Sequence, residues 1–219
     1  MRAIWKRELK SYFQTVTGWL FIAATLALFG LYFYVYNMYY GSTDISSTLS
    51  AVTFLFLVTV PILTMRTLAE ERKNKTDQLI LTSPVSVEKV VLAKYLATGT
   101  VFTISAAVMC LAPLIMSAYG SVAFVKSYVG VLGFWLYGMT CIAIGTFVSS
   151  LTESIVISAV LTFVFLFVVY LMTGITNLIS QNGNMITKIL GCYDLTKHMD
   201  MLMQGILDVS GIVYYISMI

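Results

Sequence analysis

The length, composition and charge of the chain exclude a soluble globular protein. Hydrophobic residues make up 59% of its 219 residues and charged residues 11%, against roughly 45–50% and 25% in soluble domains. A core of this size cannot enclose so much apolar surface, so much of that surface must face lipid. The net charge of +3 is modest and gives no basis for a nucleic-acid partner.

Residues 1–17 predict a helix that lies in the membrane interface before the first crossing. The segment Trp5-Lys6-Arg7-Glu8-Leu9-Lys10 is basic and amphipathic, as such helices are. No small-residue cleavage site follows the first apolar stretch, so this segment is not a signal peptide.

Five stretches without acidic or basic residues are long enough to cross a membrane, and a sixth begins near the C-terminus. A helix rises 1.5 Å per residue, so about 20 apolar residues cross about 30 Å of hydrocarbon. In chain order the stretches are 18–37, 45–65, 95–119, 127–151, 154–179 and the shorter 209–219. The sequence therefore predicts an all-α transmembrane bundle of five complete spans and an incomplete sixth, forming a single transmembrane domain over residues 1–219.

The sixth stretch, 209–219, is too short to cross as it stands. Its eleven residues would reach about 16 Å as a helix, and ending there would leave a carboxylate and unpaired carbonyls in hydrocarbon. We expect the native gene to continue for roughly ten to twenty residues, mostly apolar and ending in a basic cluster. The alternative is a half-helix that a partner subunit shields.

The distribution of basic residues predicts the orientation. Of the thirteen lysines and arginines, ten lie in residues 1–17 or in the segment 66–94. The positive-inside rule therefore places both segments in the cytoplasm. Tyrosines at positions 32, 34, 36, 39 and 40 then form an aromatic belt at the outer end of the first span. The outer segment 180–208 carries apolar residues at mostly three-to-four spacing, which predicts short amphipathic helices.

The cytoplasmic segment 66–94 predicts a rigid element between spans two and three. We expect span two to continue as a helix past Arg66, so that Arg66 can pair with Glu70, and Glu71 with Lys75, at i,i+4 spacing. Such an element can transmit a push from a soluble partner. The simpler interpretation of the same charges is a basic loop held at anionic headgroups.

The remainder of this segment predicts a short amphipathic helix and the start of span three. Residues 79–81 give the short helix an apolar edge, and Pro84 ends it, because the residue before a proline avoids the helical region. Ser86 is a good N-cap for the next helix, and Glu88 in its first turn complements the helix dipole.

Several stretches resemble one known family. The run Glu70-Glu71-Arg72-Lys73 with Lys75-Thr76, then Leu79-x-Leu81-Thr82-Ser83-Pro84-Val85-Ser86 and Lys94, resembles the coupling-helix segment of type-2 ABC transporter permeases. The resemblance is closest to the branch that contains the gliding-motility permeases. Residues 5–13 resemble that family's interfacial elbow helix, 149–154 its tight turn between spans four and five, and 208–215 the beginning of its last span.

The resemblance implies a six-span permease that pairs with a second permease subunit, identical or different, and docks its coupling helix on an ATPase subunit. The implied ATPase-coupling residues are Glu70, Glu71, Arg72, Lys75, Thr76, Leu79, Leu81, Thr82, Ser83 and Pro84. Glu153 stands at capping-box spacing from Ser150, which favours a helix start, and it is also a candidate for a second coupling contact.

Nothing in the sequence predicts catalysis by the chain itself. It contains no G-x-x-x-x-G-K-[ST] motif, so we expect ATP hydrolysis in a separate ATP-binding subunit. Cys110, Cys141 and Cys192 share no close spacing, and the single histidine, His198, cannot assemble a zinc site alone. We therefore expect no metal and no cofactor.

The sequence thus predicts the permease subunit of an ABC exporter in the cytoplasmic membrane. The five complete spans contain no deep acidic or basic residue, which disfavours an ion-coupled transporter, and no residue set for an intramembrane protease. A pathway of Thr, Ser, Tyr and Met suits an amphiphilic substrate and would also accommodate a polysaccharide. The alternative is a non-transporting anchor or sensor subunit that recruits an ATPase through the same segment.

Overall fold

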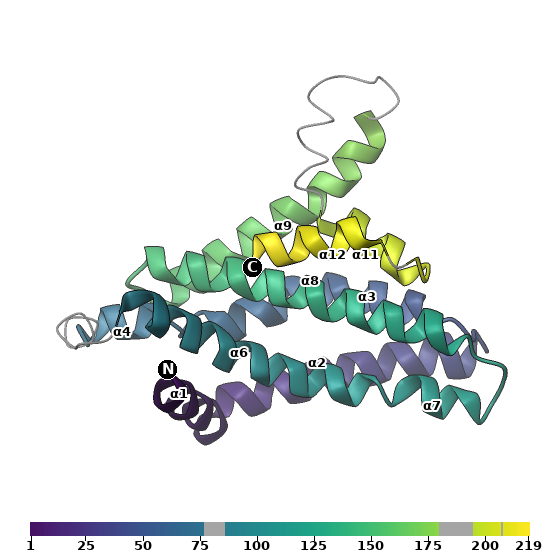
Figure 1. The fold of residues 1–219 in the computed structure, drawn as a ribbon, viewed down its shortest axis with the longest axis horizontal. Coiled ribbons are helices and arrows are strands. Elements are labelled where there is room, and N and C mark those ends of the chain that lie inside the picture. The colour runs from purple at the N-terminus through teal and green to yellow at the C-terminus, as the bar shows by residue number, and fades with distance from the viewer. Residues whose placement is uncertain (77–85, 180–194, 207) are drawn as a thin grey trace.

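The computed structural model describes residues 1–76, 86–179, 195–206 and 208–219. Within these residues all the regular elements are helices, and the long ones run side by side in an elongated bundle (Figure 1). The predicted all-α class is confirmed. In chain order the helices are α1 (Arg2–Gln14), α2 (Val16–Phe33), the π-helical η1 (Tyr34–Tyr39), α3 (Ser46–Thr64), α4 (Ala69–Lys73), α6 (Val87–Met109), α7 (Ala112–Ser117), α8 (Phe124–Leu151), α9 (Ile155–Ile179), α11 (Leu195–Met203) and α12 (Val209–Met218).

Among the described residues, four helical stretches are long and apolar enough to cross a membrane. They are Val16–Tyr39, Ser46–Lys73, Val87–Ser117 and Phe124–Leu151, and they coincide with the first four predicted spans. Helices α9 and α12 occupy the fifth and sixth predicted stretches. That these two helices cross the bilayer, and that α1 lies in the interface, remain predictions.

Helix α8 is the centre of the bundle. It packs against α3, α6, α9, α11 and α12. In the most apolar part of α8, 72% of the residues are buried, whereas in the most apolar part of Val16–Tyr39, which contains α2, 22% are buried. Helix α2 therefore presents most of its side chains outward, as expected of a lipid-facing helix.

Phenylalanine rings fill the space between α3, α6 and α8. The ring of Phe56 lies 5.2 Å from that of Phe102 and 4.9 Å from that of Phe134, each edge-to-face. Such tilted pairs are favourable because the positive edge of one ring meets the negative face of the other. Gly138 allows this packing, because a Cβ at that position would overlap the ring of Phe102.

The end of the bundle opposite α4 is fastened by a short polar network. Asn37 donates to the carbonyls of Ser42 (2.8 Å) and Asp44 (3.2 Å) and accepts from the hydroxyl of Thr48 at 2.7 Å. An ion pair lies beside this network.

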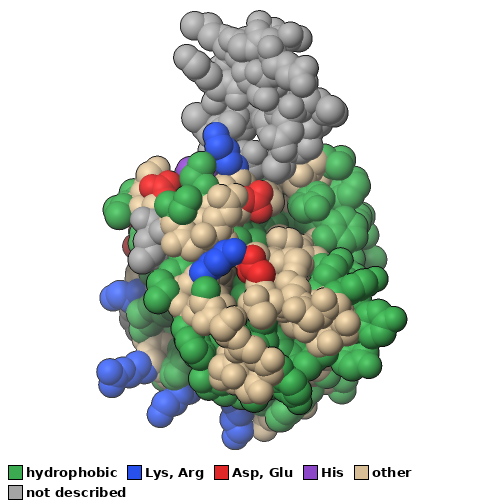
Figure 2. All heavy atoms as spheres, turned by 90° about the vertical axis from the view of Figure 1, so that its right-hand side faces the viewer, with side chains coloured by type: hydrophobic (Ala, Val, Ile, Leu, Met, Phe, Trp, Pro, Cys, Tyr) green, Lys and Arg blue, Asp and Glu red, His purple; other side chains and the backbone are tan. Residues whose placement is uncertain are grey.

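Asp44 pairs with Lys126 at 2.5 Å. Burial opposes ionisation of Asp44, but hydrogen bonds from Lys126 and Ser46 outweigh this effect and lower the pKa of the Asp44 carboxyl. Figure 2 views this end, whose surface is mostly hydrophobic and uncharged polar.

Within the segment 180–208, residues Leu195–Met203 form helix α11, and the outer location of this segment stays a prediction. Helix α11 buries Leu195, Met199, Leu202 and Met203 and packs against α8 and α9. Residues 180–194 lie outside the described residues.

Two local predictions are wrong. Span two does not continue as an unbroken helix past Arg66, because α3 ends at Thr64 and a turn over residues 65–68 separates it from α4. The capping box of Ser150 and Glu153 does not form either, because α8 extends to Leu151 and α9 starts only at Ile155. Glu153 therefore lies exposed in the intervening turn.

A glycine-to-alanine pair tests the phenylalanine packing. Gly138→Ala should lower stability by about 1–3 kcal/mol, because the added methyl group must displace a stiff aromatic ring. Gly30→Ala is the matched control, since nothing lies within 4 Å of a Cβ there, and it should leave stability unchanged or slightly higher. Thermal unfolding in detergent, followed by circular dichroism, measures both. Equal melting temperatures for the two variants would contradict the packing described.

Candidate functional site

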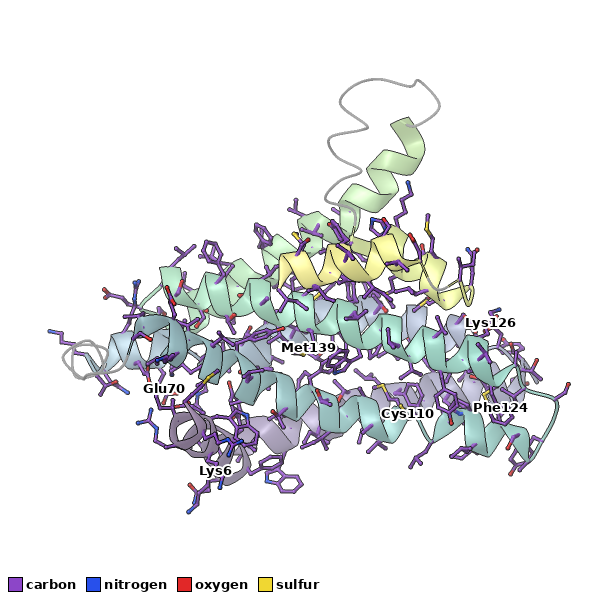
Figure 3. All side chains as sticks on the ribbon, in the orientation of Figure 1. Lys6, Glu70, Cys110, Phe124, Lys126 and Met139 are labelled. Carbon is purple, nitrogen blue, oxygen red and sulfur yellow. The ribbon has the colours of Figure 1, made fainter. Side chains whose placement is uncertain are left out.

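Polar side chains from α1, α4, α6 and α8 converge around the turn that follows α3. We call this region the joint and define it by the turn at residues 65–68 together with Glu8, Glu71, Lys94 and Ser149. Glu70, beside it, and Lys126 lie at opposite ends of the bundle (Figure 3). The joint leads directly into the segment predicted to couple to an ATPase.

The sequence of α3 favours a break at this point. Pro61 lacks an N–H, so one carbonyl of the preceding turn loses its helical partner. Thr67 then closes a tight turn, in which both its N–H (3.1 Å) and its hydroxyl (2.7 Å) donate to the carbonyl of Thr64. A threonine hydroxyl bonded in this way competes with the helical pattern.

Ser149 of α8 satisfies the backbone groups that the break exposes. Its hydroxyl oxygen accepts from the N–H of Leu68 at 3.2 Å and from that of Ala69 at 3.1 Å. The first N–H groups of a helix have no partner within the helix, and an N-cap side chain usually supplies one. Here the cap of α4 comes from a different helix, and Ser149 is fully buried.

Lys94 of α6 satisfies the other side of the break. Its ammonium donates to the carbonyl of Thr67 at 2.6 Å and pairs with the carboxylate of Glu71 at 2.8 Å. Glu8 of α1 lies further away, at 3.9 Å. Lys94 is only 3% exposed, and a buried charge of this kind is tolerated only where an opposite charge and hydrogen bonds accompany it. Glu71 is therefore its main partner.

Helix α1 is attached to the same region. Arg7 bridges Glu8 at 2.8 Å and Glu71 at 3.8 Å. The hydroxyl of Tyr12 donates to the carbonyl of Leu63 at 3.3 Å, and the indole N–H of Trp5 donates to Thr100 at 3.3 Å. Through these contacts α1, α4 and α6 are held together at one end of the bundle.

The predicted ion pairs of the coupling segment have different outcomes. The Arg66–Glu70 pair is present, with Nε and Oε2 3.6 Å apart. The Glu71–Lys75 pair is absent, because Glu71 turns inward to Lys94 and α4 ends at Lys73.

The end of α4 explains why Lys75 lies out of reach of Glu71. The N–H of Thr76 donates to the carbonyl of Glu71, and that of Lys75 to the carbonyl of Arg72, each at 3.0 Å. This is the Schellman arrangement, which places one residue in the left-handed region. Lys75 occupies that position with φ of +55°, and the helix stops there.

The other predicted coupling residues are divided between exposed positions and positions without a description. Arg72, Lys75 and Thr76 are exposed. Five lie outside the described residues, namely Leu79, Leu81, Thr82, Ser83 and Pro84. Ser86 stands at the N-cap position of α6 as predicted, although its side chain forms no capping hydrogen bond, and Glu88 lies in the first turn.

Sequence reasoning missed the roles of Glu8, Lys94 and Ser149. A signal was available for two of them. Lys94 follows the apolar run Val90-Val91-Leu92-Ala93, which is an unusual setting for a lysine unless it is paired. Glu8 is the one acidic residue in an otherwise basic N-terminal helix. Ser149 offers no such signal, because serine is common in transmembrane helices.

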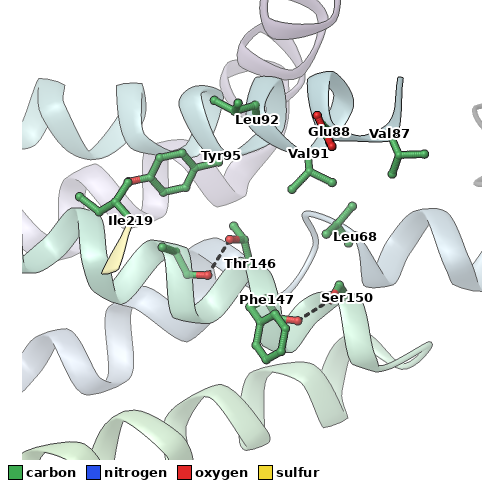
Figure 4. A pocket seen from close by; sticks show the side chains of 11 residues that line it. Leu68, Val87, Glu88, Val91, Leu92, Tyr95, Thr146, Phe147, Ser150 and Ile219 are labelled. Carbon is green, nitrogen blue, oxygen red and sulfur yellow. Dashed lines mark hydrogen bonds between the residues drawn. The ribbon is translucent and has the colours of Figure 1, made fainter. Parts of the chain in front are cut away.

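A groove of about 590 Å³ lies beside the joint, between α6 and α8 (Figure 4). Its walls are mostly apolar, and Leu68 of the turn also lines it. Glu88 lies at one end, near Val87, and Ile219 at the other, near Tyr95. Among the described residues that line the groove, Glu88 has the one charged side chain.

Comparison with protein families gave a match to a known family. The profile of a family described as "ABC-2 family transporter protein" matches residues 25–218. The matched region begins within α2 and ends in α12, so it includes α3, α4, α6 and α8, which form most of the joint. No curated protein and no solved structure matches the chain significantly.

A charge-removal series tests the joint. Lys94→Met should lower stability by about 3 kcal/mol, because it leaves Glu71 without its buried partner. Adding Glu71→Leu should recover part of this loss, and the double-mutant cycle should give a coupling of about 1–3 kcal/mol. The exposed Lys89→Met on the same helix is the control and should change stability by less than about 0.5 kcal/mol. Thermal and urea unfolding in detergent measure the control and the four proteins of the cycle, which include Glu71→Leu alone; strictly additive losses would show that the pair is not coupled.

Two adjacent serines test the cap on α4. Ser149→Ala should cost about 1–2 kcal/mol, since two backbone N–H groups lose their acceptor. Ser150→Ala removes a hydroxyl that, among the described residues, bonds to the carbonyl of Phe147 in its own helix, so it should be nearly neutral. Amide hydrogen exchange at Leu68 and Ala69 should accelerate only in the Ser149 variant. Unchanged exchange there would contradict the role given to Ser149.

Proposed function

The chain belongs to the ABC-2 transporter family, and we propose that it is the permease subunit of an ABC exporter, with ATP hydrolysed by a separate ATP-binding subunit. Within the family we assign it to the branch that resembles the gliding-motility permeases. It has six spans in the cytoplasmic membrane, with α1 in the inner interface, and it works as a dimer with a second permease subunit. The joint is the observation that carries this proposal.

The joint gives the predicted coupling segment a firm connection to the membrane helices. The segment leaves α4 at Asn74, and α4 is fixed to α6 through Glu71 and Lys94 and to α8 through Ser149. A displacement of the segment by an ATPase subunit would therefore move three helices together. A loop held only at lipid headgroups needs no such attachment.

The exposures divide the predicted coupling residues into two groups. Arg72, Lys75 and Thr76 are exposed and are the contacts that we assign to the ATPase subunit. Glu71 is only 18% exposed in its side chain and serves the joint instead. Glu153 follows α8 directly in an exposed turn, close to the end that Ser149 attaches to α4, and we keep it as the second contact.

The polar groups at the two ends support the proposed orientation. The joint end carries α1 and α4 with their lysines and arginines, as the cytoplasmic side of a membrane protein does. Tyr34, Tyr39 and Tyr40 at the other end of the first span are each more than half exposed, as residues of an interfacial belt are.

Site-directed cross-linking tests the proposal. In a variant whose Cys110, Cys141 and Cys192 are replaced by alanine, Thr76→Cys should cross-link to the co-expressed ATP-binding subunit through a short thiol-reactive reagent. It should not react in intact cells with a membrane-impermeant thiol reagent, because it faces the cytoplasm. Mass spectrometry of the cross-linked band identifies the partner peptide.

The matched control is Thr43→Cys, which is also exposed but lies at the opposite end of the bundle. It should react with the impermeant reagent from outside and form no cross-link to the ATPase. The reverse labelling pattern would refute the orientation and the coupling role together. A cross-link at Thr76 without substrate-stimulated turnover in liposomes would instead indicate an anchor or sensor subunit.

A further inference from the structure

The groove between α6 and α8 has the size and lining of a ligand site. Its volume of about 590 Å³ falls within the range of roughly 300–1,000 Å³ that small-molecule sites occupy. Val87, Val91 and Leu92 on α6 and Ala143 and Phe147 on α8 line it. These walls offer a hydrocarbon chain apolar contacts from both helices.

One end of the groove carries a negative charge. Glu88 lies in the first turn of α6, where the helix dipole favours a carboxylate, and it forms no ion pair among the described residues. The neighbouring Lys89 is exposed and does not line the groove. A ligand whose polar head lies at this end therefore meets a carboxylate.

We propose that this groove binds a single-chain cationic amphiphile, with its ammonium head at Glu88 and its hydrocarbon chain directed toward Tyr95 and Ile219. A carboxylate attracts an ammonium group and repels a phosphate or a fatty-acid head, and the attraction is stronger at a membrane boundary than in bulk water. From Val87 to Tyr95 the helix rises about 12 Å, which suits a chain of medium length. Anionic lipids fit the walls but not the charge.

The position of the groove gives such a ligand a direct contact with the joint. Leu68 lines the groove, and its backbone N–H is one of the two groups that Ser149 holds. A bound chain would pack against Leu68 and restrain the turn that precedes α4. Ligand binding should therefore raise the melting temperature, as any ligand specific for the folded state does. This inference concerns a ligand site and does not depend on the coupling role proposed above.

Binding of two charged probes of equal length tests the inference. The protein in phosphatidylcholine nanodiscs is titrated with radiolabelled decylamine or decanoate, and empty nanodiscs give the partition background. Decylamine should show a saturable component that decanoate lacks. Glu88→Gln, which removes an exposed charge that has no ion pair among the described residues and should not affect folding, should weaken decylamine binding about three- to fivefold.

Two tryptophan variants locate the saturable component. Val91→Trp fills the groove and should abolish it, whereas Val108→Trp, at an exposed position of α6 outside the groove, should leave it intact. Equal saturable binding of the two probes, or no effect of Glu88→Gln, would refute the charge selection. Equal losses in the two tryptophan variants would refute the site. The absence of any saturable component in the unmodified protein would show that lipid, a second copy or other protein chain fills the groove, which also overturns the proposal.

Discussion

The structure of the joint depends on the buried ammonium of Lys94. Without it, the carbonyl of Thr67 would lack a partner and the carboxylate of Glu71 would face the protein interior uncompensated. Both groups belong to the break between α3 and α4, so one side chain on α6 makes the break tolerable. Ser149 completes the arrangement from α8. Without these contacts, α4 could move independently of the membrane helices. Because Lys94 and Ser149 attach α4 to α6 and α8, displacement of α4 must also move these two helices.

The bilayer explains why so much of the bundle could be predicted from the sequence. In hydrocarbon every backbone polar group must be paired within the protein, and an α-helix achieves this within a single uncharged run of about 20 residues. Helices α2, α3, α6 and α8 lie where those runs predicted. The joint was not predictable in the same way. Lys94 acts on Thr67 across 27 positions in sequence and Ser149 on Leu68 across 81. The i,i+4 spacing predicted Lys75 as the partner of Glu71, but Glu71 pairs with Lys94, which lies 23 positions away in the sequence.

The assignment of roles within the candidate site changes accordingly. Sequence resemblance grouped Glu70, Glu71, Arg72, Lys75 and Thr76 as one contact surface. Their burial separates an inward residue, Glu71, from the outward ones, and only the outward group can meet a soluble subunit. Glu153 is a second residue whose local sequence spacing predicted the wrong structure. Its spacing from Ser150 suggested a helix start, but α8 continues through Ser150, whose hydroxyl bonds back to Phe147.

Lys94 binds both the carbonyl of Thr67 and the carboxylate of Glu71, and these two partners restrict which residues position 94 can carry in relatives. An exchange of Glu71 for a neutral residue removes the counter-charge but leaves the carbonyl of Thr67 still in need of a donor. Position 94 should therefore retain a side chain with N–H groups even in relatives that lose the acid at 71, with glutamine or arginine as the acceptable replacements. Relatives in which the helix of the second span runs unbroken have no free carbonyl to satisfy, and only there should an aliphatic residue appear at this position. The residue at position 94 should therefore indicate whether the second span of a relative is broken.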